Sequence, residues 1–134
     1  MQEILYKAKR TDTKKWVQGY IVRPHRRDDE GNVIMWVFNA LDEKGWVSEC
    51  VVDAETVCQY IGLPDAHKEK LWEHDIIHIP GEDEHFHLQW DKDSARFAMI
   101  SESLIVDFDN YWSHEVEAVG NIFDNPELME YSAE

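Results

Sequence analysis

Short runs of β-branched and aromatic residues, each closed by turn-forming residues, follow one another along this chain of 134 residues. The strongest run extends from Val33 to Leu41 and ends at the turn-forming segment 42–45, so we expect a central β-strand there. Four more short runs lie at residues 2–8, 15–22, 46–52 and 56–61. The first two of these predict a β-hairpin. The sequence therefore predicts a mostly β protein, α+β at most.

A second series of short runs occupies the C-terminal half of the chain. It consists of Leu71-Trp72 together with Ile76 to Ile79 as one strand, then Phe86 to Trp90, Ala95 to Ile100, Leu104 to Phe108 and Val116 to Phe123. Strands of this length and spacing are typical of small barrels. We expect an SH3-like-sized β-barrel here, packed with the N-terminal hairpin or sheet. Asn125 and Pro126 predict the start of a short C-terminal helix.

The chain contains no internal repeat, no low-complexity tract and no linker rich in Pro, Gly or Ser. A domain of this length can bury roughly two-thirds of its unfolded surface, so it needs neither a disulfide nor a metal ion to stabilise its core. We therefore expect one domain over residues 1–134, with subdomains 1–65 and 66–134 as the alternative.

Cysteine usage and hydropathy bear on location. Cys50 and Cys58 have neither the spacing of a metal-binding pair nor a signal peptide before them, so a reduced intracellular thiol pair is expected. No stretch approaches the roughly 18 apolar residues that a membrane-spanning helix needs. The sequence predicts a protein of the cytoplasm that has no membrane partner.

The net charge of −15 is divided unevenly along the chain. Residues 1–27 carry a net charge of +6 and the remainder carries −21. The basic start, interleaved with Tyr6, Trp16 and Tyr20, suggests nucleic-acid binding, although the acidic remainder opposes it. The acidic remainder suggests a basic partner or imitation of nucleic acid. Internal charge complementarity and solubility account for the same distribution.

Four of the seven histidines suggest a transition-metal site, and with it the alternative of a metal-binding protein or metalloenzyme. They are His74, His78, His85 and His87. On strands, residues two or four apart share a face, so the two pairs could converge from a hairpin on Zn²⁺ or Fe²⁺. Surface or strand-edge histidines explain the same pattern, and no cofactor is required. Motifs for nucleophilic catalysis, dinucleotide binding and phosphate binding are absent from the sequence, so an enzyme is not expected.

Four stretches resemble the YopX family of phage and prophage proteins. They are YKAKRTDTKKWVQGY at 6–20, VDAETVCQYIGLPD at 52–65, LWEHDII at 71–77 and VEAVGNIFDNPELM at 116–129. The sequence departs from the family pattern at Cys58, Ile61 and His74, where the family has Gly, Thr and Gly, and it has no Gly in the turn 66–70.

The resemblance implies a β-rich fold, a phage or prophage origin and no enzymatic activity. It implies structural roles for the motif residues Gln59, Gly62, Asp75, Gly120, Asn121, Asn125 and Pro126. Gly62 and Gly120 would supply backbone freedom, with a bulge or close backbone approach at Gly120. We therefore expect a non-catalytic interaction or regulatory module. Its partner would be a host or phage protein, or a second copy of the chain.

Overall fold

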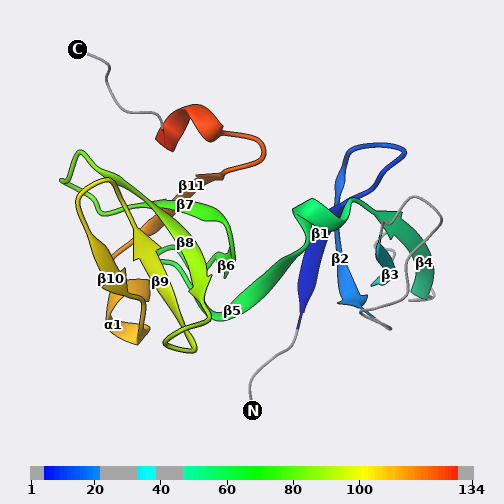
Figure 1. Ribbon diagram of the computed structural model, residues 1–134, viewed down its shortest axis with the longest axis horizontal. Helices are drawn as coiled ribbons and strands as arrows, with labels where there is room; N and C mark the ends of the chain where they lie inside the picture. The colour runs from blue at the N-terminus through cyan, green and yellow to red at the C-terminus, as the bar shows by residue number, and fades with distance from the viewer. Residues whose placement is uncertain (1–4, 22–32, 39–46, 130–134) are drawn as a thin grey trace. The chain divides into compact units, whose positions relative to one another are not determined.

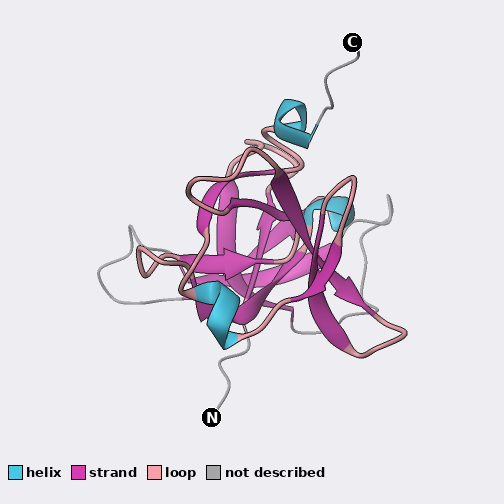
Figure 2. Cartoon of the chain, turned by 90° about the vertical axis from the view of Figure 1, so that its left-hand side faces the viewer, coloured by secondary structure: helices cyan, strands magenta, loops and turns pink. Residues whose placement is uncertain are grey.

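The computed structural model describes residues 5–21, 33–38 and 47–129. These residues form eleven β-strands with three short helical segments between or after them. Strands dominate the drawing in Figure 2. The prediction of a mostly β protein is confirmed. The chain divides into two compact units, Met1–Tyr60 and Ile61–Glu134, and the boundary lies within a strand.

The first unit is built on the predicted hairpin. Strands β1 (Tyr6–Lys9) and β2 (Trp16–Ile21) pair antiparallel, with Ala8 opposite Val17. Strand β3 (Val33–Phe38) pairs with β2 on one side and with β4 (Val47–Val52) on the other, as expected for a central strand. The sheet order is β4-β3-β2-β1-β5-β6 (Figure 1). Strand β5 (Cys58–Pro64) crosses the unit boundary, and β6 (Lys70–Trp72) follows at the end of the sheet.

One face of this sheet forms the core of the first unit. Ala8, Val33, Cys50 and Val52 are buried together, with Val17 and Ile21 packed against them. The alternation along β2 puts Val17, Gly19 and Ile21 on this face and Trp16, Gln18 and Tyr20 on the other. Cys50 and Cys58 are both free thiols.

The second unit contains a five-stranded antiparallel sheet in the order β10-β9-β8-β7-β11. Its strands are β7 (Asp75–His78), β8 (His85–Asp91), β9 (Arg96–Ile100), β10 (Ile105–Asp107) and β11 (Glu117–Asn121). The core of this unit gathers Ile61, Leu71, Ile77, Phe86, Leu88, Met99, Phe108 and Val116. Phe86 and Leu88 alternate with His87 and Gln89 along β8, so the sheet has one face in this core and a second face that mixes polar and apolar residues.

The closed barrel predicted for this half is not confirmed. In the described residues the sheet has two ends, β10 and β11, and no pairing joins them. The spacing of the apolar runs predicts how many strands there are. It does not predict whether the two edge strands pair to close the sheet into a barrel.

Two local predictions are corrected or refined. The residues 71–79 do not form one strand, because a turn at Glu73 and His74 separates β6 from β7. The carboxylate of Asp75 accepts a hydrogen bond from the Trp72 backbone N–H at 2.9 Å, and His74 has φ 73°. The predicted C-terminal helix is present as a 3-10 helix, Pro126–Met129, and the segment beside β10 contains one short α-helix, α1 (Asn110–Ser113).

Candidate functional site

The four histidines predicted as a metal site separate into two pairs. His74, in the turn before β7, places its Nδ1 2.9 Å from Nε2 of His87 on β8. One of these nitrogens donates and the other accepts. The ring of Phe123 packs against His74 edge-on, with a centroid distance of 5.6 Å. Burial, followed by the nearby charge of His74, lowers the pKa of His87 to about 4.

The second pair lies near the opposite end of the β7–β8 hairpin. His78 and His85 are directly paired across the strands, with ring centroids 5.3 Å apart. Nδ1 of His78 lies 3.2 Å from Oε1 of Glu117, and its Nε2 lies 2.6 Å from the carbonyl oxygen of Glu82. Both partners are acceptors, so the ring donates to both only when it is doubly protonated.

Glu117 on β11 also contacts His67. Nε2 of His67 lies 3.3 Å from Oε2 of Glu117. The hydrogen bonds from His67 and then from His78 lower the pKa of the Glu117 carboxyl. Within the described part of the chain, no three His, Cys, Asp or Glu side chains are placed to hold a metal ion. The four histidines therefore lie as two separate pairs, because the turn at His74 directs that residue to His87 rather than to His78.

A cavity of about 470 Å³, called the hollow below, lies at the five-stranded sheet, mainly on the face opposite the core. It is lined by Glu73, His74, Gln89, Trp90, Asp91, Lys92, Asp93, Ala98, Ile100 and Ile105. The register explains the set, because Ile105 pairs with Ile100 and Gln89 pairs with Ala98 on neighbouring strands. Residues directly opposite one another share a face.

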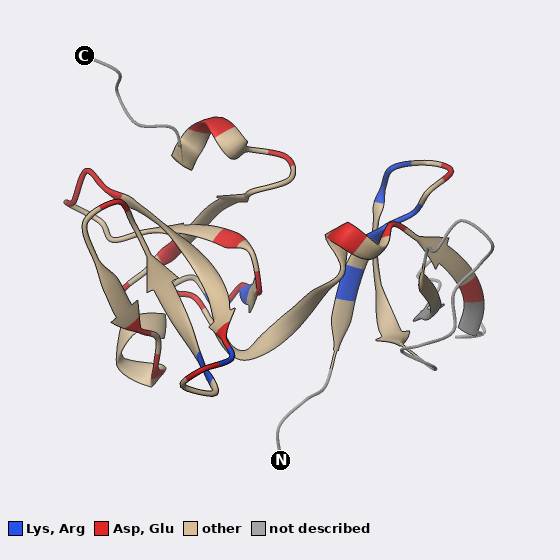
Figure 3. Cartoon of the chain, in the orientation of Figure 1, with Lys and Arg blue, Asp and Glu red and all other residues tan. Residues whose placement is uncertain are grey.

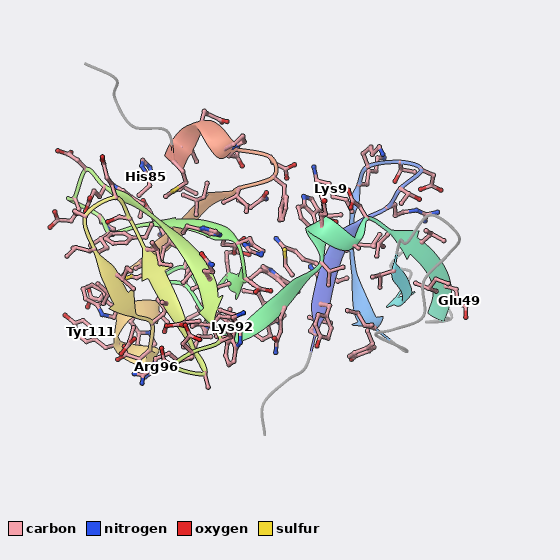
Figure 4. The ribbon with its side chains drawn as sticks, viewed as in Figure 1. Lys9, Glu49, His85, Lys92, Arg96 and Tyr111 are labelled. Carbon is pink, nitrogen blue, oxygen red and sulfur yellow. The ribbon has the colours of Figure 1, made fainter. Side chains whose placement is uncertain are left out.

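The hollow combines an apolar floor with an acidic rim. Ala98, Ile100 and Ile105 supply apolar surface, and Ile105 is 73% exposed. Glu73, Asp91 and Asp93 supply carboxylates, against the single cation Lys92 among the lining residues. Figure 4 labels Lys92 in the connection that follows β8. Exposed isoleucine beside carboxylates is the kind of surface that binds an apolar and cationic segment.

Sequence reasoning did not identify this hollow. The available signal was the alternation His87, Gln89, Asp91 on β8, which marks a polar face. The pairing of Ile100 with Ile105 depends on a turn between β9 and β10, where Ser101 N–H donates to the Leu104 carbonyl at 2.9 Å. Nothing in the local pattern specified that register.

The motif residues of the first half lie on β5. Gln59 pairs with Tyr6 of β1, and Gly62 has φ 90°, in the left-handed region that favours glycine. Asp75 is buried at the start of β7 and bonds to the Trp72 turn described above.

The motif residues near the C-terminus organise the end of β11. The register shifts between Ala118 and Gly120, which is a β-bulge at the expected glycine. The Asn121 side-chain oxygen accepts from the backbone N–H of Phe123 and Asp124 at 3.0 and 2.9 Å. Asn125 Oδ1 accepts from the Asn121 N–H at 3.3 Å, and Pro126 is the first residue of the 3-10 helix. These contacts give the motif a structural role.

The fold is that of a mostly β protein with two compact units and two antiparallel sheets. The family model described as "YopX protein" matches residues 5–130, and the chain belongs to the YopX family.

A solved structure supports the fold. Protein EF1440 from Enterococcus faecalis is similar over 97% of this chain and 100% of its own, with a TM-score of 0.63 and 19% sequence identity. No curated protein matches the chain. Among the described helices, none has the length and apolar character to cross a membrane.

Proposed function

We propose that this protein is a non-catalytic interaction module, encoded by a phage or prophage and acting in the host cytoplasm. Its site is the hollow, and its partner is a protein segment that carries both apolar and cationic side chains. The single observation that supports this role is the juxtaposition of exposed Ile105 with the carboxylates of Glu73, Asp91 and Asp93.

Charge favours a foreign partner over a second copy of the chain. The second unit contains 4 Lys and Arg against 18 Asp and Glu, a net charge of −14. Acidic segments recur around this unit in Figure 3. Two such surfaces repel each other, whereas a basic segment is attracted and its association is accelerated.

The edge of β10 provides backbone groups for the same partner. The carbonyl oxygen of Leu104 accepts a hydrogen bond from the Ser101 N–H. The Phe108 N–H donates to the carbonyl oxygen of Phe97 on β9. Because bonding alternates along an antiparallel strand, Ile105 and Asp107 direct their N–H and C=O groups away from β9. No strand of the described residues pairs with that edge. An extended segment can therefore add to β10 while one of its apolar side chains meets Ile105.

The test uses two fluorescein-labelled peptides, one alternating Lys with Val and one alternating Glu with Val. Fluorescence anisotropy with the full chain should show saturable binding of the Lys peptide alone. Ile105→Lys should weaken this binding about tenfold or more, on the order of the ~1.4 kcal/mol that a good apolar contact provides. The matched control is Tyr111→Lys, because Tyr111 is 63% exposed and does not line the hollow.

Equal loss in the Ile105→Lys and Tyr111→Lys variants would mean that the peptide responds to net charge alone, and the proposal would fail. Equal binding of the Glu peptide, or no binding of either peptide, would also contradict it. A pull-down from host lysate with wild type and Ile105→Lys in parallel then identifies the natural partner as the protein retained by the wild type and lost from the variant.

A further inference from the structure

The outer face of the β1–β2 hairpin gathers lysines around a tryptophan. Nζ of Lys7 lies 4.6 Å from the centroid of the Trp16 ring, and Nζ of Lys9 lies 5.5 Å from it. The strand register produces this arrangement, because Lys9 is directly opposite Trp16 and Lys7 is opposite Gln18. All of these side chains occupy the face opposite the core of the first unit.

The same face continues along β2 to a second aromatic ring. Trp16, Gln18 and Tyr20 alternate with the core-facing residues, and Tyr20 is 40% exposed. Residues four apart on a strand are roughly 13 Å apart, at about 3.3 Å per residue. Two aromatic rings with an exposed amide between them can accept successive bases by stacking and hydrogen bonding.

Local charge on the hairpin is strongly positive. Residues 7–15 include five Lys and Arg and one acid, Asp12, which pairs with Arg10 at 2.9 Å. The first unit as a whole has 9 Lys and Arg against 10 Asp and Glu, a net charge of −1. Basic residues lie on β1 and on the β1–β2 connection in Figure 3. Figure 4 shows Lys9 on β1 and Glu49 on β4; the Lys and Arg of residues 7–15 lie on β1 and the β1–β2 connection, beside the aromatic residues of β2.

We propose that this hairpin face binds single-stranded nucleic acid without sequence preference, at a site separate from the hollow. Bases stack on Trp16 and Tyr20, and Lys7 and Lys9 exchange their contacts with the Trp16 ring for contacts with phosphates. A single strand fits because its base faces are accessible to aromatic rings, whereas a duplex covers them. Because the attraction comes from lysine–phosphate contacts, we expect binding to weaken as salt rises, and the net charge of −15 opposes binding at every salt concentration.

The test is fluorescence anisotropy of the full chain with a labelled oligothymidine at low salt. We expect saturable binding that weakens steeply as salt rises. Trp16→Ala should weaken binding about tenfold, because loss of one stacked base costs ~1 to 3 kcal/mol. Trp16→Phe should retain most of it. The double variant Lys7→Ala/Lys9→Ala should also bind more weakly and should reduce the salt dependence.

Two matched controls locate the site. Trp90 is 43% exposed, more than the half-buried Trp16, and lies in the second unit, so Trp90→Ala should bind as the wild type does. Ile105→Lys removes the peptide site and should leave Trp16-dependent stacking in place. No anisotropy change at low salt would overturn the inference. So would equal losses in Trp16→Ala and Trp90→Ala, or wild-type binding by the double lysine variant.

Discussion

Nδ1 of His74 lies 2.9 Å from Nε2 of His87, which ties the turn between β6 and β7 to the neighbouring strand β8. The first imidazole belongs to a residue in the left-handed conformation, with φ 73°, and the second is held neutral by burial. The contact thus connects a turn that sequence reasoning missed with the residue whose pKa is lowered to about 4.

The lowered pKa of His87 makes stability depend on pH between about 6.5 and about 4. In this window the unfolded chain binds a proton at residue 87 that the folded chain does not, so the free energy of unfolding decreases as pH falls. The contribution of neutral His87 to the free energy of unfolding is fully present above about pH 6.5 and is lost as the pH falls to about 4. His87→Gln should remove this component. Urea denaturation at several pH values in that window checks it, and parallel curves for wild type and variant would contradict it.

Gly120 has no room for a side chain. A Cβ built on Gly120 would lie 2.7 Å from Cγ of Asn125, the residue whose side chain bonds to Asn121. Gly120→Ala should therefore destabilise the fold by about 1 to 3 kcal/mol through overpacking. In an Asn125→Ala background the same substitution should cost much less. Additive costs in chemical denaturation would show that the two residues do not compete for space.

Lys68 occupies the left-handed region without being glycine. Its φ is 68°, in the turn between β5 and β6. Lys68→Gly should stabilise the protein by about 0.5 to 1 kcal/mol, because it relieves this strain at some cost in unfolded-state entropy. The control is Lys92→Gly, at an exposed turn residue without positive φ, which should destabilise slightly. A thermal shift of the same sign in both variants would refute the strain argument.

Asp65 is a buried carboxylate that satisfies three backbone groups. Its oxygens accept from the N–H groups of His67, Glu69 and Ala118 at 2.8, 2.9 and 3.0 Å, and its exposed fraction is 3%. Asp65→Ala leaves these donors without an acceptor and should cost about 2 to 4 kcal/mol in urea denaturation. Asp93→Ala, at an exposed position, should stay within about 0.5 kcal/mol of wild type. A small loss at Asp65 would mean that water replaces the carboxylate.

Much of the fold was predictable because its strands are marked by local residue types. Val33–Phe38 is rich in β-branched and aromatic residues, Phe86 to Trp90 alternates apolar with polar residues, and both segments lie in strands. The bulge at Gly120 followed from a glycine inside a strand pattern. The break at His74 did not follow, because that turn is made by a histidine with positive φ and by Asp75, without glycine or proline.

The candidate sites, like the fold, were predictable from the sequence only in part. The lysines and aromatic residues of the hairpin were visible as a basic, aromatic segment, and the register of β1 with β2 placed Lys9 opposite Trp16. The hollow was not predictable, since Ile100 and Ile105 meet through a pairing between strands. The four histidines were visible in the sequence, but they lie in two separate pairs, His74 with His87 and His78 with His85, which local spacing does not reveal.

The boundary between the two units falls between Tyr60 and Ile61, inside β5 rather than in a loop. The residues before it pair with β1, while Gly62 and Pro64 after it belong to the other unit. A genetic exchange that joined the first half of one such gene to the second half of another would have to preserve one continuous strand across the junction. Recombination at this point would divide a secondary-structure element, so we expect the two halves, with net charges of −1 and −14, to be exchanged together rather than separately.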